Sequence, residues 1–459
     1  MTRRAELEVT LGRAAGGRRS AAAKPFRALV LAGFSGAAPA PTMAARRISA
    51  DDFDAVLHEL APTVSLEIAG PPAVRETLKL TALDDFHPDR LLERVAALRE
   101  PSLAAAAPPT VAEGARELAA GAQAAESDAD LLGRLLGQRA SSTAPSRAQQ
   151  KVRELIEGAL AGATAAASPA RDDALRAART ALLRAILNDS GFRDLERAWR
   201  SVHFLATRLD EDQLELHIAD LSKAALSEQL ARSNGRLEAT PLHALLVGRG
   251  GDEPWDAVVT DYTFTLAHDD LMLLAMLGAL AARVPAPLLA HADLSLCGCR
   301  TASGVDAPWD WKIGDDEVGQ LWHEVRRHPA AKQLVLAAPR FVLRHPYGRR
   351  TDPIESFGFE ELPSRPSRDA FLWASPAFAC AYWLAAQGAA GAEDSAETAI
   401  DDLPAPSFDD GRGDDVQPPL EVLLTERARA AAEQHGIVAL AGGRNTTRIA
   451  AGGLFAFAE

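Results

Sequence analysis

The apolar residues that follow residue 190 recur with a helical period. Phe192, Leu195 and Trp199 lie three and four residues apart, which places them on one face of a helix. Asp189, just before them, carries a side-chain oxygen that can cap the helix start. The charged residues between them belong to the opposite face, which we expect to be solvated: Arg193, Asp194, Glu196, Arg197 and Arg200.

From residue 213 the period changes to two. Apolar and polar residues alternate through 213–220, a pattern that predicts a strand with one buried face. Ser222 follows and opens a short helix over 224–231. A helix, a strand and a second helix form a packing unit, and none of its residues stands in a pattern typical of a nucleophile or a metal ligand.

The N-terminal hundred residues predict a small set of strands and helices. An apolar strand over 26–34 precedes an amphipathic helix over 51–60, whose first turn is acidic, as the helix dipole favours. Alternating residues predict a strand over 64–68, and a further strand is expected over 77–83. A helix over 90–99 completes this region.

The later part of the chain predicts strands and helices in alternation. The predicted strands are 242–248, 255–264, 288–292, 333–338, 418–425 and 437–440. A long apolar helix over 269–284 separates two of them, and strand–helix–strand order is typical of a parallel or mixed sheet. We therefore predict an α/β fold with mixed sheets flanked by helices, in two or more domains.

Composition and charge narrow the possible partners. The chain has 459 residues, of which 47% are hydrophobic, enough for two or three domains with their own cores. Its net charge of −14 argues against nucleic acid or an anionic membrane as the main partner, since both require a cationic surface. The basic residues within 1–24 form a short arm that we predict to be disordered.

Apolar runs and cysteine content indicate a location. No apolar run approaches the roughly 20 residues of a membrane span, and the long run at 271–284 is interrupted by Gly278 and Arg283. Three cysteines are too few for a disulfide framework and suit a reducing compartment. We predict a cytoplasmic protein without membrane insertion.

The motifs of catalysis and ligand binding are incomplete. The glycines of 248–251 are not followed by the lysine that a phosphate-binding loop needs. His323 and His328 are five residues apart, so on a helix their rings diverge instead of sharing one metal ion. Cys297 and Cys299 lack a second pair for zinc and are expected to be buried thiols. We expect no cofactor, no metal and no enzymatic activity.

Four segments together resemble a known family. The helix at 192–205 and the segments 339–348, 352–361 and 371–379 are similar, the last three almost position by position, to the large contractile sheath subunit of bacterial type VI secretion systems. One departure is Ala374, where the family usually has glycine, and the acidic residues of 352–361 are expected on a solvated face. The positions that carry the resemblance are Phe192, Leu195, Trp199, Pro339, Arg340, Phe341, Pro346, Tyr347, Gly348, Asp352, Pro353, Phe357, Phe359, Glu360, Trp373 and Phe378.

The beginning of the chain resembles the small sheath subunit of the same systems. The strand at 26–34, the helix start at Asp51–Asp54 and the segment Leu83–Pro88 occur in the order that the small-subunit family shows. The predicted parts are a disordered basic arm at 1–24, a small-subunit-like domain at 25–100, a linker with a leucine-bearing helix at 101–146, and a large-subunit-like domain at 147–459 with an acidic loop at 388–413.

The resemblance implies a structural subunit of a contractile sheath that assembles around an inner tube and contracts to propel it. The implied partners are the chain itself or other sheath subunits, the inner tube protein, the baseplate and a recycling AAA+ unfoldase. The unfoldase would grip the leucine-bearing helix at Leu131, Leu132, Leu135 and Leu136. The residue pattern alone favours the alternative, an ordinary amphipathic helix that docks on its own domain.

Two other functions remain open at this stage. Compared with the large-subunit family, the sequence lacks a segment expected after Glu459, which would suit a non-contractile adaptor, cap or baseplate-associated relative. An α/β enzyme with a pocket near 248–251 would need an acid–base or metal constellation that these residues do not supply.

Overall fold

The computed structural model describes residues 24–37, 43–68, 74–99, 168–248, 253–284, 286–300, 305–363, 366, 368–390, 399–405, 408–409, 415–416 and 419–459. They belong to two compact units. The main unit comprises Met1–Leu66, Glu76–Leu91 and Leu187–Glu459, and the minor unit comprises Glu67–Arg75 and Leu92–Ile186.

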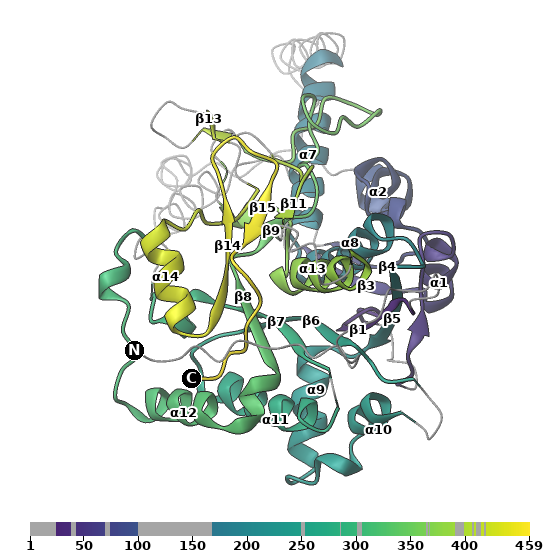
Figure 1. Cartoon of the computed structure of the whole chain (residues 1–459). Helices are drawn as coiled ribbons and strands as arrows, with labels where there is room; N and C mark the ends of the chain where they lie inside the picture. Colours follow the sequence, from purple (N-terminus) through teal and green to yellow (C-terminus); the bar gives the residue numbers. More distant parts are fainter. Residues whose placement is uncertain are drawn as a thin grey trace, which may run out of the picture. The chain divides into compact units, whose positions relative to one another are not determined.

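A nine-stranded mixed sheet forms the centre of the main unit (Figure 1). Its strands, in spatial order, are β11 (Ala399–Ile400), β15 (Ile449–Ala451), β14 (Ile437–Gly442), β8 (Leu334–Ala338), β7 (Leu288–Ala292), β6 (Ala257–Phe264), β1 (Phe26–Ala32), β5 (Leu214–Asp220) and β2 (Arg46–Arg47). The strands from β14 to β5 run parallel, while β15, β11 and β2 pair antiparallel at the two sides.

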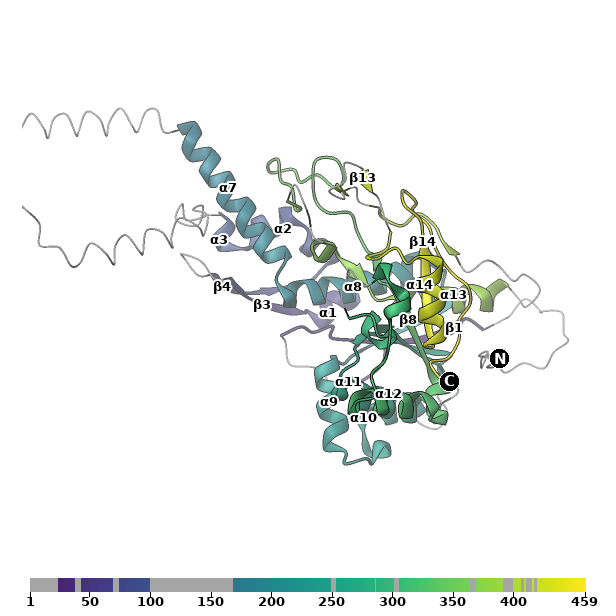
Figure 2. The same ribbon diagram turned by 90° about the vertical axis from the view of Figure 1, so that its left-hand side faces the viewer.

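Helices cover both faces of this sheet (Figures 1 and 2). On one face lie α9 (Lys223–Arg232), α10 (Pro241–Val247), α11 (His268–Ala281) and α12 (Glu317–Arg327), and on the other α8 (Ser190–Arg208) and α13 (Pro376–Ala390). The central strands are buried on both sides, which explains why β7 and β8 are apolar at almost every position. The predicted α/β fold with helix-flanked mixed sheets is confirmed.

Strand β1 lies inside the sheet although it comes from the beginning of the chain. Each of its residues pairs in parallel with β5, from Phe26 opposite Leu214 to Ala32 opposite Asp220. On its other side it pairs with β6. The domain boundary predicted after residue 100 is thus a boundary in the sequence, but the central sheet contains strands from both sides of it.

The shorter elements complete the two units. They are α1 (Phe53–Leu60), β3 (Thr63–Ile68) paired with β4 (Val74–Lys79), the 3-10 turn η1 (Leu83–Phe86), α2 (Pro88–Arg94), α3 (Ala96–Arg99), α7 (Ser168–Leu187), β9 (Phe341–Val342) paired with β10 (Trp373–Ala374), β12 (Phe408–Asp409) paired with β13 (Asp415–Val416), and α14 (Glu426–Gln434). In the minor unit, Arg179 of α7 donates hydrogen bonds to the carbonyl oxygens of Leu98 and Arg99, both at 3.1 Å, and so satisfies the end of α3.

Most of the predicted elements are confirmed, but the strand predicted over 242–248 is wrong. These residues form helix α10, because Thr240 caps it through the N–H of His243 at 3.2 Å and Pro241 occupies its first position. Leu242 and Leu246, one turn apart, are the buried pair of that helix. A short leucine-rich run fits either structure, and the capping residues decide between them.

Three other boundaries also differ from the prediction. The strand expected over 77–83 lies earlier, as β4 at Val74–Lys79, and Leu83 already belongs to η1. The strand predicted over 418–425 is reduced to a single bridge between Leu420 and Phe341, and the next helix begins at Glu426. The helix predicted over 90–99 is divided at Val95 into α2 and α3. Within the residues that the structure covers, no helix has the length and apolar character to cross a membrane.

Candidate functional site: the buried junction at helix α8

Helix α8 begins where its capping residue predicts. The Asp189 side chain accepts a hydrogen bond from the N–H of Phe192 at 2.9 Å, so one of the free amides of the first turn is satisfied. The apolar face of the helix is fully buried, including Phe192, Leu195 and Trp199. These three motif residues lie in the core, as their spacing predicts.

Trp199 connects α8 to the beginning of the chain. Its indole N–H donates a hydrogen bond to the carbonyl oxygen of Phe34 at 3.1 Å, in the turn after β1. Its ring meets Phe34 and Phe53 edge to face, with centroids 5.2 and 5.8 Å apart. The residues of 26–66 and 76–91 to which Phe34 and Phe53 belong are called the N-terminal segment below.

A second aromatic contact joins the N-terminal segment to the first turn of α8. Phe86, at the end of η1, meets Phe192 edge to face at 5.4 Å, and both side chains are fully buried. The sequence motif around Leu83–Pro88 thus places its phenylalanine against the first aromatic residue of the α8 motif.

The polar face of α8 is solvated at Asp194, as predicted, but not at Glu196. Glu196 is completely buried and accepts hydrogen bonds from Arg200 at 2.7 Å and from Arg344 at 2.8 Å. Arg344 also pairs with Glu361 at 2.7 Å, so the prediction that the acidic residues of 352–361 are solvated is wrong for Glu361. Likewise, Arg197 pairs with the buried carboxylate of Asp261 at 2.9 Å. Helical periodicity cannot reveal such partners, which come from distant parts of the chain.

Opposite charges balance in this buried cluster of Glu196, Arg200, Arg344 and Glu361. Burial alone would raise the pKa of the Glu196 carboxyl, but the charges and hydrogen bonds of Arg344 and Arg200 outweigh it, so the pKa lies below the ordinary value. Burial disfavours the Arg344 cation, yet Glu196 and Glu361 hold its pKa well above the ordinary value. Glu196 and Arg344 are therefore both charged, and removing either of them would leave an opposite charge of the cluster less compensated in the interior.

Tyr347 lies at the edge of this charged cluster. Arg344 stacks over its ring at 4.2 Å and Arg200 donates to its hydroxyl at 3.1 Å, while burial raises the pKa of the phenol to about 12. The ring of His87, from the N-terminal segment, approaches the Tyr347 ring edge to face at 4.9 Å. Glu361 accepts the backbone N–H of Tyr347 at 2.7 Å and so fixes the loop.

Asp89 completes the junction from the N-terminal segment. Its carboxylate accepts the backbone N–H of Glu355 at 2.9 Å and the hydroxyl of Ser356 at 2.7 Å. Burial opposes its charge, but these hydrogen bonds lower the pKa of the Asp89 carboxyl below its ordinary value. The sequence did not indicate this role, because an aspartate in the first turn of a helix is already favourable there.

The motif residues divide into a buried and a peripheral group. Those buried in the structure are Phe192, Leu195, Trp199, Pro339, Phe341, Pro346, Tyr347, Gly348, Phe359, Trp373 and Phe378. The partly or fully exposed ones are Arg340, Asp352, Pro353, Phe357 and Glu360. Arg340 pairs with Glu421 at 2.5 Å, and Leu131, Leu132, Leu135 and Leu136 lie outside the described residues.

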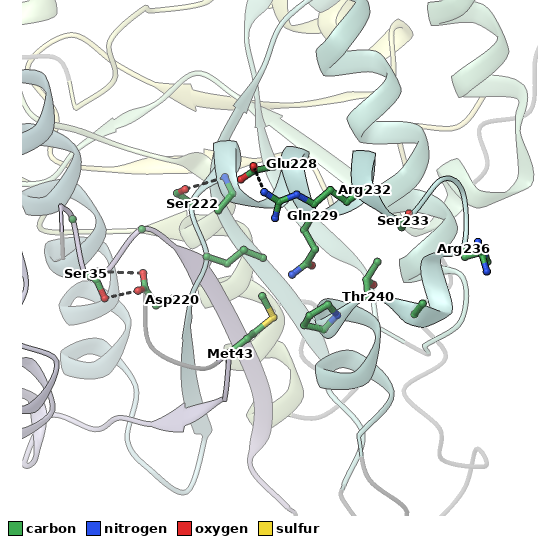
Figure 3. A pocket seen from close by; sticks show the side chains of 16 residues that line it. Ser35, Met43, Asp220, Ser222, Glu228, Gln229, Arg232, Ser233, Arg236 and Thr240 are labelled. Carbon is green, nitrogen blue, oxygen red and sulfur yellow. Dashed lines mark hydrogen bonds and ion pairs between the residues drawn. The ribbon is translucent and has the colours of Figure 1, made fainter. Parts of the chain in front are cut away.

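A cavity of about 780 Å³ opens at the carboxyl ends of β1 and β5 (Figure 3). Ser35 and Asp220 face it, but they are hydrogen-bonded to each other, and Asp220 also accepts the N–H of Phe34 at 2.7 Å. Arg232 is paired with Glu228 on α9. The residues lining the cavity include no histidine, cysteine or lysine, and the described chain brings together no three His, Cys, Asp or Glu side chains able to share a metal ion. This cavity therefore offers no acid–base constellation.

Comparison with known protein families gives one match on each of the two regions that meet at the junction. The family profile described as EvpB/VC_A0108, tail sheath N-terminal domain, matches residues 174–453. The profile described as type VI secretion system, VipA, VC_A0107 or Hcp2, matches residues 1–105. The chain is also similar to the type VI secretion system sheath protein TssC1 of Pseudomonas aeruginosa, with 30% identity over 292 residues, or 60% of this chain. It spans 58% of the length of that relative.

Proposed function

The chain belongs to the tail sheath family of type VI secretion systems, and on that basis we propose that it is a structural subunit of a contractile sheath. In this function it assembles with other sheath subunits around an inner tube, engages the baseplate, and shortens to propel the tube. The sheath acts in the cytoplasm, and an AAA+ unfoldase recycles it through the segment that carries Leu131, Leu132, Leu135 and Leu136, where the sequence predicts a helix.

One observation carries this proposal: the regions matched by the two sheath profiles share one core. β1 lies between β5 and β6, and Phe53 and Phe86 pack on α8. The two kinds of sheath sequence therefore fold together as the body of one subunit. A sheath built from many identical bodies would do its work by changing the packing between them, without covalent chemistry.

Electron microscopy of the purified protein tests the proposal. Negatively stained samples of the full chain, alone and mixed with its tube protein, should contain long hollow tubes with regular surface ridges. A variant with alanine at the four leucines should form the same tubes, because these residues are assigned to recycling and not to assembly. Monomers or small rings under every condition would contradict the sheath function and favour the non-contractile adaptor.

A further inference from the structure

The N-terminal segment already fills the surface on which a small-subunit-like chain would dock. β1 is paired along its whole length with β5. On its other side, residues Ala28–Leu31 pair with β6, so both edges of the strand are hydrogen-bonded. A strand from another molecule could enter this position only by displacing β1 and breaking the hydrogen bonds on both sides.

Side-chain burial strengthens this occupation. Phe34 and Phe86 are fully buried and Phe53 is 4% exposed, each against an aromatic residue of α8. Polar contacts also hold the edge of the N-terminal segment at two separate places, which are called the two rim contacts below. Asp89 holds the backbone of Glu355 and Ser356, and Arg47 of β2 pairs with Glu211 at 2.9 Å.

We propose that each chain docks its own N-terminal segment in cis and is thereby closed to a separate small sheath subunit, so that its assembly partner is another copy of itself. This inference rests on the proposed sheath function. Covalent connection favours it further, because a tethered segment acts at an effective concentration that can reach the order of millimolar, against which a free competitor at micromolar concentration is weak.

Crosslinking distinguishes docking within one chain from exchange between chains. The double variant Asp89→Cys/Ser356→Cys places thiols at one rim contact, and Arg47→Cys/Glu211→Cys places them at the other, on exposed side chains. Each variant is expressed with and without ¹⁵N, the two forms are co-refolded as an equal mixture, and a short bismaleimide is added. Single-cysteine variants control for random capture, and the wild type controls for the three native cysteines, which are buried.

Docking in cis predicts crosslinked peptides that are entirely light or entirely heavy, in protein of monomer mass. Mixed light–heavy peptides at either rim would show that the segment docks on a neighbouring chain, and absence of crosslinks at both rims would show that it does not dock here. Either result overturns the proposal. Because two independent rims are probed, local damage by one pair of substitutions cannot decide the outcome.

Exclusion of a free subunit is measured on the wild-type chain. A second copy of residues 1–100, fused to a soluble carrier protein, is co-refolded in excess with tagged full-length chain, so that it can fold on its acceptor surface, and the full-length chain is then captured through its tag, with the carrier alone as control. We expect no retention above the carrier, and retention would overturn the proposal. Both experiments use unassembled protein, so their outcomes are independent of tube formation. If both give the expected result but the chain never forms tubes, the sheath function alone is refuted. If the chain forms tubes but gives mixed light–heavy crosslinks, only this inference is refuted.

Discussion

Replacing Trp199 with alanine tests the packing of the N-terminal segment on α8. The indole is completely buried, and the substitution removes its contacts with Phe34 and Phe53 together with the hydrogen bond to the Phe34 carbonyl oxygen. Truncating a buried large aromatic residue costs about 3–5 kcal/mol. The lost partner of the carbonyl group adds about 1 kcal/mol, and these contributions overlap, so we expect a loss near the upper end, about 5 kcal/mol.

Urea unfolding followed by far-UV circular dichroism measures this loss from the shift in midpoint at constant slope. Trp199→Phe keeps part of the buried aromatic surface but removes the N–H donor and the second ring of the indole, so it should cost less than Trp199→Ala, about 2–3 kcal/mol. The matched control is Trp309→Ala, because Trp309 is 66% exposed and its removal should change stability by less than about 0.5 kcal/mol.

The three variants should also differ in stability in a definite order. Trp199→Ala must be the least stable of the three variants, and its amide exchange should rise in β1 and α1, which pack around the indole. If Trp199→Ala were as stable as Trp309→Ala, the indole would not hold the N-terminal segment, and the junction at α8 would have to be abandoned as the basis of a joint core.

Three further predictions concern the charged cluster, a glycine and the recycling helix. Arg344→Met should cost about 3–5 kcal/mol, because the buried carboxylate of Glu361 loses its ion-pair partner and Glu196 keeps only Arg200. The folded pKa of Glu196 lies below its ordinary 4.5, so its stabilisation is present above that pH and is lost as the pH falls. Urea midpoints from pH 7 to 3 should therefore decline less in Glu196→Gln. A parallel decline in both proteins would contradict this assignment. Gly436→Ala should destabilise the protein by about 1–2 kcal/mol, because φ is +78° and a Cβ would lie 2.6 Å from the backbone oxygen of Phe457. Gly348→Ala should cost less, because its Cβ would come closest to the flexible end of the Glu360 side chain. Equal urea midpoints of the two variants would refute this distinction. Alanine at Leu131, Leu132, Leu135 and Leu136 should leave assembly intact and abolish capture by the unfoldase in a pull-down, and unchanged capture would end that assignment.

Local patterns predicted those parts of the fold that local interactions determine. The start of α8 at its Asp189 cap and the alternation that becomes β5 follow from side chains within a few residues of each other. The sequence pattern does not predict helix α10, because five apolar residues in seven, three of them leucines, fit both periods. Only the cap at Thr240 and the proline after it favour the helix.

The junction itself was less predictable, because its contacts join residues far apart in the sequence. Glu196 follows a helical period that predicts solvent exposure, yet Arg344 arrives from 148 positions away to neutralise it. Asp89 holds Ser356 across 267 positions. Only the motif resemblance pointed to these loops, and it identified Tyr347 and Gly348 without indicating which side chains they contact.

The interior position of β1 also affects how the chain is made. Its neighbours β5 and β6 end at Asp220 and Phe264, so the ribosome releases an apolar strand long before either partner exists. With synthesis at about 5–20 residues per second, the roughly 190 residues between the ends of β1 and β5 correspond to a wait of about 10–40 s. During that time the strand has two unpaired edges, each able to join another nascent chain. A sheath protein of this architecture therefore depends on protection during translation, and its yield should fall when neighbouring ribosomes on one message are crowded.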